Sequence, residues 1–400
     1  MSNLSQLVDE LCPDGVPHLA LGEVGEFIRG NGLQKSDLTD EGVPAIHYGQ
    51  IHTFYGTWTS QTKSFVAPDL ALKLRRARQG DLIIATTSED DQAVAKATAW
   101  LGETEVAVSG DAYILRHRLD PRFVSYFFQT ADFQSQKLRA ITGTKVRRIS
   151  GDSLATIRIP EPPIEVQREI VRILDTFTEL EAELEAELEA RTRQYAYYRE
   201  TLLNARPPGS RTLALGDIGR VLMCRRVFKS ETTPVGEIPF FKIGTFGGSP
   251  DAFISQRLYD DYRRQFSYPN PGEILISAAG TIGRVIRYGG EPAYFQDSNI
   301  VWLNHDESVV LNAYLYHWYS SVNWSTDGGT IQRLYNASIL RMTISVPPVD
   351  YQKWVIEVLD RFETLVNSLT DGLPAEFIAR RQQYEYYRDR LLTFDELIDE

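Results

Sequence analysis

The chain has 400 residues, 42% of them apolar, and a formal net charge of −12. This length exceeds one ordinary hydrophobic core, so roughly two or three domains are expected. The sequence has no run of about 18 apolar residues and no basic, apolar leader, so we expect neither a membrane span nor export and predict a cytoplasmic protein. Only two cysteines are present, which argues against a disulfide framework or a thiolate metal cluster.

The negative charge is concentrated in two segments. Acidic residues outnumber basic ones by 11 to 6 in residues 157–205 and by 12 to 6 in residues 347–400. Residues 18–156 and 206–346, in contrast, are neutral or slightly basic. A solvated helix accounts for most of the acidity, so the net charge does not exclude nucleic-acid binding by the blocks between.

The first block, residues 1–156, is predicted to mix strands and helices. LIIATT (82–87) and AYILR (112–116) are short apolar runs of the kind found in strands. Residues 123–138 have the pattern of surface helices. We therefore assign the block to the α+β class.

Residues 157–205 are predicted to form one long helix. Heptad spacing from Ile170 places Phe177, Leu184 and Tyr198 on one apolar stripe. A helix of about 40 residues is a rod of roughly 60 Å. Within it the four residues LEAE repeat, which keeps the leucines on a slowly drifting stripe. A repeat can therefore be gained or lost without destroying the packing face, so the run is predicted to adjust the length of the helix.

The second block, residues 206–346, resembles the first in its pattern. ILISAA (274–279) and NIVWL (299–303) are strand-like, and residues 311–322 are predicted to form a surface helix. The glycine-rich stretches GTFGGSP (244–250) and GTIGR are predicted to be turns, with phosphate contact as the less favoured interpretation.

Residues 347–400 are predicted to form a second long helix that pairs with the first. The apolar spacing runs through Val355, Phe362 and Leu369 and then shifts by four residues near Pro374. We expect a kink at this point, or a helix in two pieces. The two apolar stripes are predicted to bury each other as an antiparallel coiled coil.

The second half of the chain repeats the first. A diproline followed by Gln167 and Leu174-Asp175 recurs as a diproline followed by Gln352 and Leu359-Asp360. LALGEVG at the start of the first block recurs as LALGDIG in the second. These matches indicate a duplicated unit of about 190 residues. The predicted fold is α+β, with two pseudo-symmetric globular domains joined and separated by two long antiparallel coiled-coil helices.

The sequence contains no recognisable catalytic constellation. Its six histidines form no His-x-x-x-His pair and lie near no acidic cluster at metal spacing, so no metal site is predicted. Neither GxxxxGK[ST], GxGxxG nor GxSxG is present, and the clustered carboxylates belong to the predicted helices. We therefore predict a protein that is not an enzyme.

The remaining polar signals are of the contact type. Arg, Asn and Gln pair with base edges, whereas Lys, Thr and backbone amides hold phosphates. For any single residue an ordinary exposed loop is the better interpretation, but the repetition of such loops in both blocks favours DNA contact. The candidate DNA-binding residues are Arg29, Asn31, Gln34, Lys35, His47, Tyr48, Gln50, Thr86, Thr87, Ser88, Thr144, Lys145, Arg147 and Arg148 in the first block, and Arg225, Arg226, Lys229, Lys242, Thr245, Thr281, Arg284, Thr330 and Arg333 in the second.

The chain resembles the specificity subunit of type I restriction-modification enzymes. The resemblance rests on two variable blocks that alternate with matched helices, on PEPPIEVQREIVRILD at the junction, and on the LEAE repeat. The resemblance covers the whole chain. It implies domains with boundaries at 1–156 and 206–346 that each recognise part of a double-stranded DNA target. It also implies that the helices at 157–205 and 347–400 are conserved spacers that set the distance between half-sites.

The same resemblance implies partner subunits. Two modification subunits would supply S-adenosylmethionine and methylate adenine, and two restriction subunits would supply ATP- and Mg-dependent translocation and cleavage. This chain would hold none of these cofactors. The absence of an NPPY motif and of a Walker A loop agrees with that division. Two alternatives stay open: a coiled-coil scaffold with two protein-binding heads and no DNA role, and the recognition fragment of a fused methyltransferase.

Overall fold

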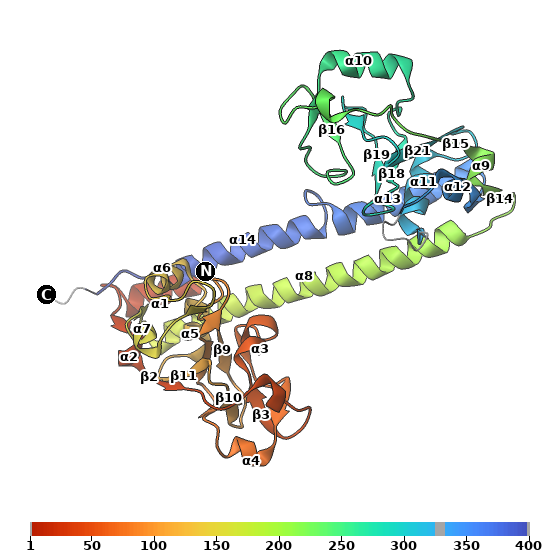
Figure 1. Cartoon of the computed structure of the whole chain (residues 1–400). Helices are drawn as coiled ribbons and strands as arrows, with labels where there is room; N and C mark the ends of the chain where they lie inside the picture. Colours follow the sequence, from red (N-terminus) through yellow and green to blue (C-terminus); the bar gives the residue numbers. More distant parts are fainter. Residues whose placement is uncertain (1, 325–332, 398–400) are drawn as a thin grey trace. The chain divides into compact units, whose positions relative to one another are not determined.

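The computed structural model describes residues 2–324 and 333–397 (Figure 1). The chain divides into two compact units. Unit 1 comprises Met1–Leu184 and Phe377–Glu400, and unit 2 comprises Glu185–Glu376. Among the described residues, no helix has both the length and the apolar character needed to cross a membrane.

The centre of unit 1 is a five-stranded sheet. Its order is β2 (Gly25–Arg29), β11 (Ala112–His117), β7 (Leu82–Ala85), β9 (Ala97–Trp100) and β4 (Trp58–Thr59). Neighbouring strands are antiparallel, except that β4 pairs parallel with β9. All four residues of β7 are buried, because both faces of the sheet are covered. The apolar run LIIATT contains this strand, as predicted, and the structure places it at the centre of the sheet.

A second sheet and several short helices complete unit 1. The sheet has the order β5 (Ser64–Val66), β3 (Val43–Ile46), β10 (Val106–Val108) and β6 (Arg76–Ala77), and β8 (Thr87–Ser88) pairs separately with β12 (Arg147–Arg148). The short helices are α1 (Ser2–Leu11), α2 (Leu21–Val24), η1 (Lys35–Asp37), α3 (Tyr48–Thr53), α4 (Pro68–Ala71), α5 (Pro121–Phe127), α6 (Ala131–Leu138) and α7 (Gly151–Ala155).

The prediction of surface helices at residues 123–138 was wrong for α5. Residues 123–127 are all buried, because α5 lies between the sheet and the long helix that follows. Aromatic residues fill this interface, and Phe128 stacks on Phe133 of α6 with ring centroids 4.1 Å apart. The sequence showed an amphipathic pattern but could not show that both sides of α5 are covered.

Unit 2 repeats this plan. Its four-stranded sheet has the order β15 (Gly219–Leu222), β21 (Ile300–His305), β18 (Ile274–Ser277) and β19 (Val285–Arg287). Its three-stranded sheet has the order β17 (Phe253–Ile254), β16 (Ile238–Phe241) and β20 (Tyr294–Phe295). The short helices are α9 (Leu215–Ile218), η2 (Lys229–Glu231), α10 (Gln256–Gln265), α11 (Asn312–Ser321) and α12 (Asn336–Arg341). The helix predicted at 311–322 is α11, but it is buried rather than on the surface, because it packs between β19 and a long helix.

Each block leaves and returns to its spacer helix through a pair of antiparallel strands. In unit 1 these are β1 (His18–Ala20) and β13 (Arg158–Pro160), and in unit 2 they are β14 (Arg211–Ala214) and β22 (Thr343–Val346). An equivalent backbone hydrogen bond closes each pair. Leu21 N donates to Ile157 O at 2.8 Å in unit 1, and Leu215 N donates to Met342 O at 2.9 Å in unit 2. The duplication predicted from LALGEVG and LALGDIG is therefore present in the backbone.

The predicted long helix is α8 (Ile164–Asn204), which has 41 residues. The second spacer is two helices, α13 (Val349–Asn367) and α14 (Leu373–Leu391). The chain leaves the helix at Ser368 and starts a new one next to Pro374, so the predicted interruption is confirmed. Leu369, predicted to continue the apolar stripe, is 71% exposed, because it lies in the connection rather than in a helix.

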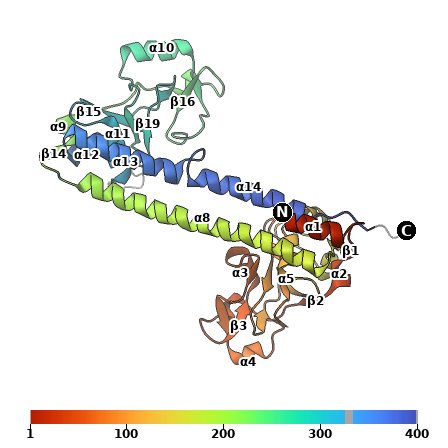
Figure 2. The ribbon, with the colours of Figure 1, turned by 180° about the vertical axis from the view of Figure 1, so that it is seen from behind.

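The spacer helices pack in antiparallel pairs inside each unit (Figures 1 and 2). In unit 1, Phe177 of α8 stacks on Tyr387 of α14, with ring centroids 5.7 Å apart. In unit 2, Tyr198 of α8 stacks on Phe362 of α13 at 5.3 Å. The heptad assignment from Ile170 is thus confirmed where aromatic residues meet, whereas Leu180 of the LEAE run is 49% exposed.

A buried glutamine ties each block to its helix. In unit 1 the Oε1 of Gln167 accepts from Asp120 N at 2.8 Å, and its Nε2 donates to Pro162 O at 2.7 Å. In unit 2 the Oε1 of Gln352 accepts from Leu311 N at 2.9 Å, and its Nε2 donates to Pro347 O at 2.9 Å. Each side chain therefore joins the N-cap residue of a block helix to the diproline that precedes the spacer.

We predict that Gln167→Ala lowers the free energy of unfolding by roughly 1 to 3 kcal/mol, because it leaves the part-buried amide of Asp120 and the buried carbonyl of Pro162 without this partner. Chemical denaturation of the full chain measures this change. Gln382→Ala, on the exposed side of α14, is the matched control and should change stability little. Equal stability of both variants would show that the Gln167 contacts contribute nothing.

Candidate nucleic-acid interface

The basic loop of unit 1, residues 142–148, lies against the candidate residues Thr87 and Ser88 of strand β8. Strand β12 pairs with β8, so that Arg147 faces Ser88 and Arg148 faces Thr87. The loop turns at Gly143, whose φ is +91° and where a Cβ atom would lie 2.1 Å from Val146 O. Only glycine fits there, because the backbone is left-handed and Val146 O of the same loop is close.

Helix α3 lies next to strand β8 and has one histidine at its N-cap and another in its last turn. His47 caps α3, and burial together with the positive charge of Lys35 lowers its pKa, against the opposing effect of Asp111. His47 is therefore neutral at neutral pH. Tyr48 packs at 4.5 Å from the His47 ring, and His52 on the same helix contacts Thr87 O through Nε2 at 2.9 Å. Helix α3 is thus tied to β8, which in turn pairs with β12 of the basic loop.

Other candidate side chains in unit 1 already have partners within the protein. Asn31 uses both ends of its amide, donating to Lys73 O at 2.9 Å and accepting from Arg75 N at 2.7 Å. Gln50 donates to Ser64 Oγ at 2.8 Å. Thr86 is buried and donates to Asp111 O at 3.0 Å, and Arg29 Nε donates to Gly110 O at 3.1 Å. Their DNA contacts remain predictions, as do those of the exposed residues Gln34, Thr144 and Lys145.

The candidate residues of unit 2 gather around one cavity. Arg226, Lys229 and Lys242 line it together with the turn at 296–299. The Oγ1 of Thr245 accepts from Lys242 N at 3.1 Å, and Arg333 NH2 donates to Ser298 O at 3.2 Å, so both lie beside the cavity.

Of the other candidates of unit 2, all but one lie within the residues that the structure describes. Arg284 NH1 donates to Phe246 O, next to Thr245. Thr281 follows β18 in an exposed turn, and Arg225 lies over the Phe266 ring at 5.1 Å. Thr330 lies outside the described residues. The turns predicted at 244–250 and in GTIGR are confirmed.

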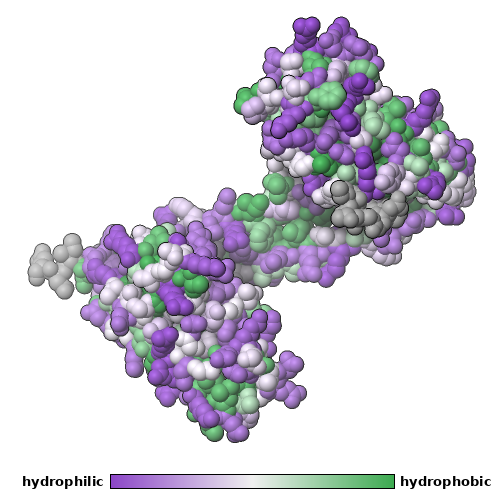
Figure 3. All heavy atoms as spheres, in the orientation of Figure 1, coloured by the Kyte–Doolittle hydropathy of each residue, from purple (hydrophilic) through white to green (hydrophobic). Residues whose placement is uncertain are grey.

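Aspartates that the sequence did not single out pair with several of these cations. Asp91 lies 2.8 Å from Arg147 Nε, Asp297 lies 2.9 Å from Arg226 Nε, and Asp251 lies 2.8 Å from Lys242 Nζ. In the described part of the chain, Lys145 and Arg148 have no such acidic partner. On the face shown in Figure 3, hydrophilic side chains cover most of each unit, with hydrophobic ones scattered among them. The charge of both candidate surfaces is therefore mixed rather than uniformly positive.

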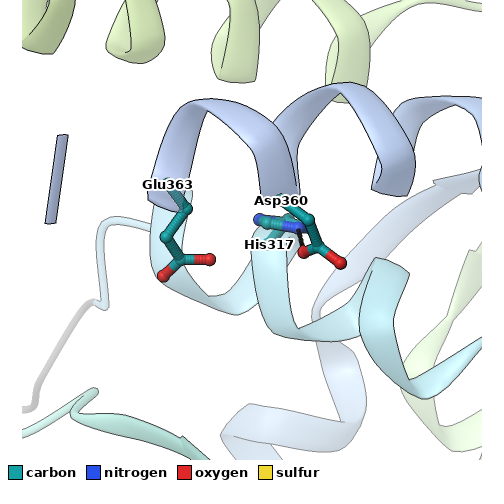
Figure 4. A group of neighbouring side chains, drawn as sticks. All are labelled: His317, Asp360 and Glu363. Atoms are coloured by element: carbon teal, nitrogen blue, oxygen red, sulfur yellow. Dashed lines mark hydrogen bonds and ion pairs between the residues drawn. The ribbon is translucent and has the colours of Figure 1, made fainter. Parts of the chain in front are cut away.

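One histidine lies beside two carboxylates, which the sequence analysis did not predict. His317 Nε2 of α11 donates to Asp360 Oδ1 at 2.7 Å, and Glu363 lies one turn further along α13 (Figure 4). Their ligand atoms lie within 4.8 Å of one another, as a metal site requires. His317 is more than 40 positions from both carboxylates, so no local spacing in the sequence could have shown the group.

The internal duplication explains this group better than a metal does. The corresponding residues of unit 1 are Tyr126, Asp175 and Thr178, and Tyr126 OH donates to Asp175 Oδ1 at 2.7 Å and lies 3.2 Å from Thr178 Oγ1. In both units the contact fastens the block helix to the spacer helix. In unit 2 the guanidinium of Arg287 also lies 3.9 Å from Asp360 and partly neutralises it.

The two contacts differ in their response to acid. Burial lowers the pKa of His317 more than Asp360 raises it, so the folded chain favours the neutral ring. The unfolded chain binds the proton more readily, so this contribution to stability is present above the ordinary histidine pKa of about 6.5 and is lost as the pH falls below it. The tyrosine contact of unit 1 does not titrate in this range.

We predict that the double change His317→Tyr with Glu363→Thr, which copies the contact of unit 1, makes the chain less sensitive to acid. The measurement is the melting temperature at about pH 7.5 and about pH 5.5, on either side of the ordinary histidine pKa. The control is His18→Gln, which removes another histidine from the chain. The same acid sensitivity in the double variant and the unchanged chain would contradict the assignment.

Comparison with known proteins gives one family for both halves. Residues 13–190 and 207–377 each match the type I restriction modification DNA specificity domain. The chain is 47% identical over 288 residues to a putative type I restriction enzyme specificity subunit of Haemophilus influenzae, covering 70% of this chain and 74% of that protein. It is 33% identical over 253 residues to the EcoR124I/EcoR124II specificity subunit of Escherichia coli, covering 59% and 61%.

Solved structures show the same fold. A chain from a type I R-M system, solved in work on its complex assembly and conformational transition, superposes with a TM-score of 0.65 at 19% identity, over 95% of this chain and 98% of that one. The S subunit of a type I restriction-modification system from M. genitalium gives a TM-score of 0.53 at 14% identity, over 94% and 96%. At these identities the likeness concerns the fold alone.

Proposed function

Since this chain belongs to the family of type I restriction modification DNA specificity domains, we propose that it is the DNA-recognition subunit of a type I restriction-modification complex. The observation that carries the proposal is that the DNA specificity domain occurs twice in the chain, over residues 13–190 and 207–377. Because the two blocks differ in sequence, the target is bipartite and asymmetric, with two different short sequences separated by unspecified base pairs.

The chain contributes recognition, and partner subunits contribute chemistry. Two modification subunits dock on the spacer helices and methylate adenine with S-adenosylmethionine, and two restriction subunits add ATP- and Mg-dependent translocation and cleavage. The duplication supports this stoichiometry, since a surface made twice accepts the same partner twice. The alternative of a coiled-coil scaffold with no DNA role is not supported, because both blocks match a DNA specificity domain.

The test is the modification pattern of DNA from cells that express this chain with a cognate methyltransferase subunit. The proposal expects one methylated motif in two unequal parts with a fixed spacer. Cells with the methyltransferase subunit alone are the control and should lack this motif. A single contiguous motif, or the same motif without this chain, would refute the proposal.

We predict that Lys145→Ala with Arg148→Ala weakens DNA binding and lowers the slope of log affinity against log salt by about 0.9 for each lost phosphate contact. Arg147 is excluded because Asp91 already pairs with it. The measurement is titration of target DNA at several salt concentrations. Lys353→Ala with Arg361→Ala removes the same charge from α13 and is the control. An unchanged slope would place the loop outside the DNA interface.

We also predict that deleting Glu185 to Leu188 shortens the spacer of the target by one base pair, or at most two. The division between the units falls after Leu184, inside the LEAE run. Four residues of helix span ~6 Å and rotate one end by ~40°. B-DNA turns by roughly 34° to 36° and rises by about 3.4 Å for each base pair. The rotation of the helix therefore matches a spacer shorter by one base pair, and its loss of length matches a spacer shorter by two. The motif of the deletion variant decides this: an unchanged spacer, or altered half-sequences, would show that α8 is not a ruler.

A further inference from the structure

The cavity of unit 2 contains two pairs of opposite charge that differ in chemistry. It encloses about 550 Å³ and is lined by Arg226, Lys242, Asp251 and Asp297, among others. One pair joins Arg226 to Asp297, and the other joins Lys242 to Asp251. Both cations were candidates for DNA contact, but an arginine and a lysine held by a carboxylate present different groups to a ligand.

The Arg226 side chain is held at its inner end and open at its outer end. Its Nε donates to Asp297 Oδ2 at 2.9 Å. The Asp297 side chain is 18% exposed, whereas the Arg226 side chain is 62% exposed. Because Nε is engaged, NH1 and NH2 form the free edge of the guanidinium, and within the described residues no acceptor contacts them. This edge is the fork that matches two adjacent acceptors.

The carboxylate that holds Arg226 is itself on a fixed turn. Ser298 has a φ of +53°, which is rare for a residue with a side chain. Asn299 N donates to Asp297 O at 2.6 Å, and Arg333 NH2 donates to Ser298 O at 3.2 Å. A strained turn that is tied by several bonds cannot follow a moving side chain. Asp297 therefore restricts the directions in which the fork can point.

The neighbouring pair offers no such fork. The Nζ of Lys242 lies 2.8 Å from Asp251, and an ammonium is a point charge whose remaining donors rotate freely. Lysine therefore suits a phosphate oxygen, while an oriented guanidinium suits a planar pair of acceptors. In the major groove, the pair of acceptors that arginine most often contacts is O6 and N7 of guanine.

We propose that Asp297 positions Arg226 to bind the O6 and N7 atoms of a guanine, so that the half-site read by unit 2 contains a G·C pair at the position facing Arg226. This inference rests on the proposed DNA-recognition function and adds the base and the residue that reads it. Asp297 is a positioning residue, because it acts through Arg226 and does not contact DNA itself.

The test compares three variants of the full chain assembled with its methyltransferase subunit. Arg226→Lys keeps the charge and removes the fork, Asp297→Asn removes the positioning carboxylate, and Asp251→Asn removes an equal charge from the same cavity. Each assembly methylates a DNA library in which one half-sequence is randomised while the other stays intact, and the two halves are randomised in separate experiments. Sequencing of the methylated molecules gives the base preference at each position.

The expected result is that Arg226→Lys lowers the preference for G·C at one position of one half-sequence by about 10-fold or more, within the range of a bidentate base contact. Asp297→Asn lowers the same preference, and Asp251→Asn leaves it unchanged. The other half-sequence keeps its preferences in all three variants, which confirms that each assembly is folded and active.

Two results would overturn the inference. If Arg226→Lys and Asp297→Asn leave every base preference unchanged and alter only affinity, the fork binds a phosphate. If Asp251→Asn alters the same position as much as Asp297→Asn, the effect is one of charge and not of positioning. These results are separate from failure of the proposed function, in which the unchanged chain would yield no bipartite motif and the inference would fall with it.

Discussion

The architecture depends on one buried contact that the chain makes twice. Gln167 and Gln352 each bond to the amide of the N-cap residue of a block helix and to a carbonyl of the diproline that precedes a spacer. A buried amide of this kind is costly unless both of its ends are bonded, so the contact fixes the block at one angle to its helix. Each block also leaves and returns through two paired strands. The loops of a block that do not touch the spacer can therefore vary without changing the attachment.

This separation of attachment from surface explains why the sequence was informative about the fold. The diproline, the glutamine and the Leu-Asp pair stand at fixed spacing in both halves, so the duplication and the two spacers could be predicted from them. The break near Pro374 followed from a shift of four residues in the apolar spacing. The exposure of Leu369 did not follow from the sequence. A heptad count runs on past Asn367, whereas the helix ends there.

The candidate interface was less predictable, because its hydrogen bonds and ion pairs join residues that are far apart in the sequence. Asn31 and Gln50 have the right chemistry to read bases, but backbone groups and a serine more than ten residues away occupy their amides. The aspartates that pair with Arg147 and Arg226 lie 56 and 71 positions from them in the sequence, so no local pattern joins them. A sequence shows which cations are available, but only the fold shows which of them are already paired.

The acidic character of the chain also has a simple place in this arrangement. Glutamates of the LEAE run pair with arginines on the same helix, as Glu187 does with Arg191 and Glu189 with Arg193. Such exposed pairs add little stability, but they keep a long helix soluble. The net negative charge of the chain therefore comes from the spacers, whereas the blocks carry charges of both signs.

The most direct test of the account is a chimera in which residues 215–342 are replaced by a second copy of residues 21–157. Both segments begin and end at the same backbone bond, made by Leu21 and Ile157 in one unit and by Leu215 and Met342 in the other. If each block reads its half-site independently, the assembled chimera methylates DNA that carries one of the two half-sequences twice. A chimera that still requires both original half-sequences would contradict the account, because recognition would then lie outside the blocks.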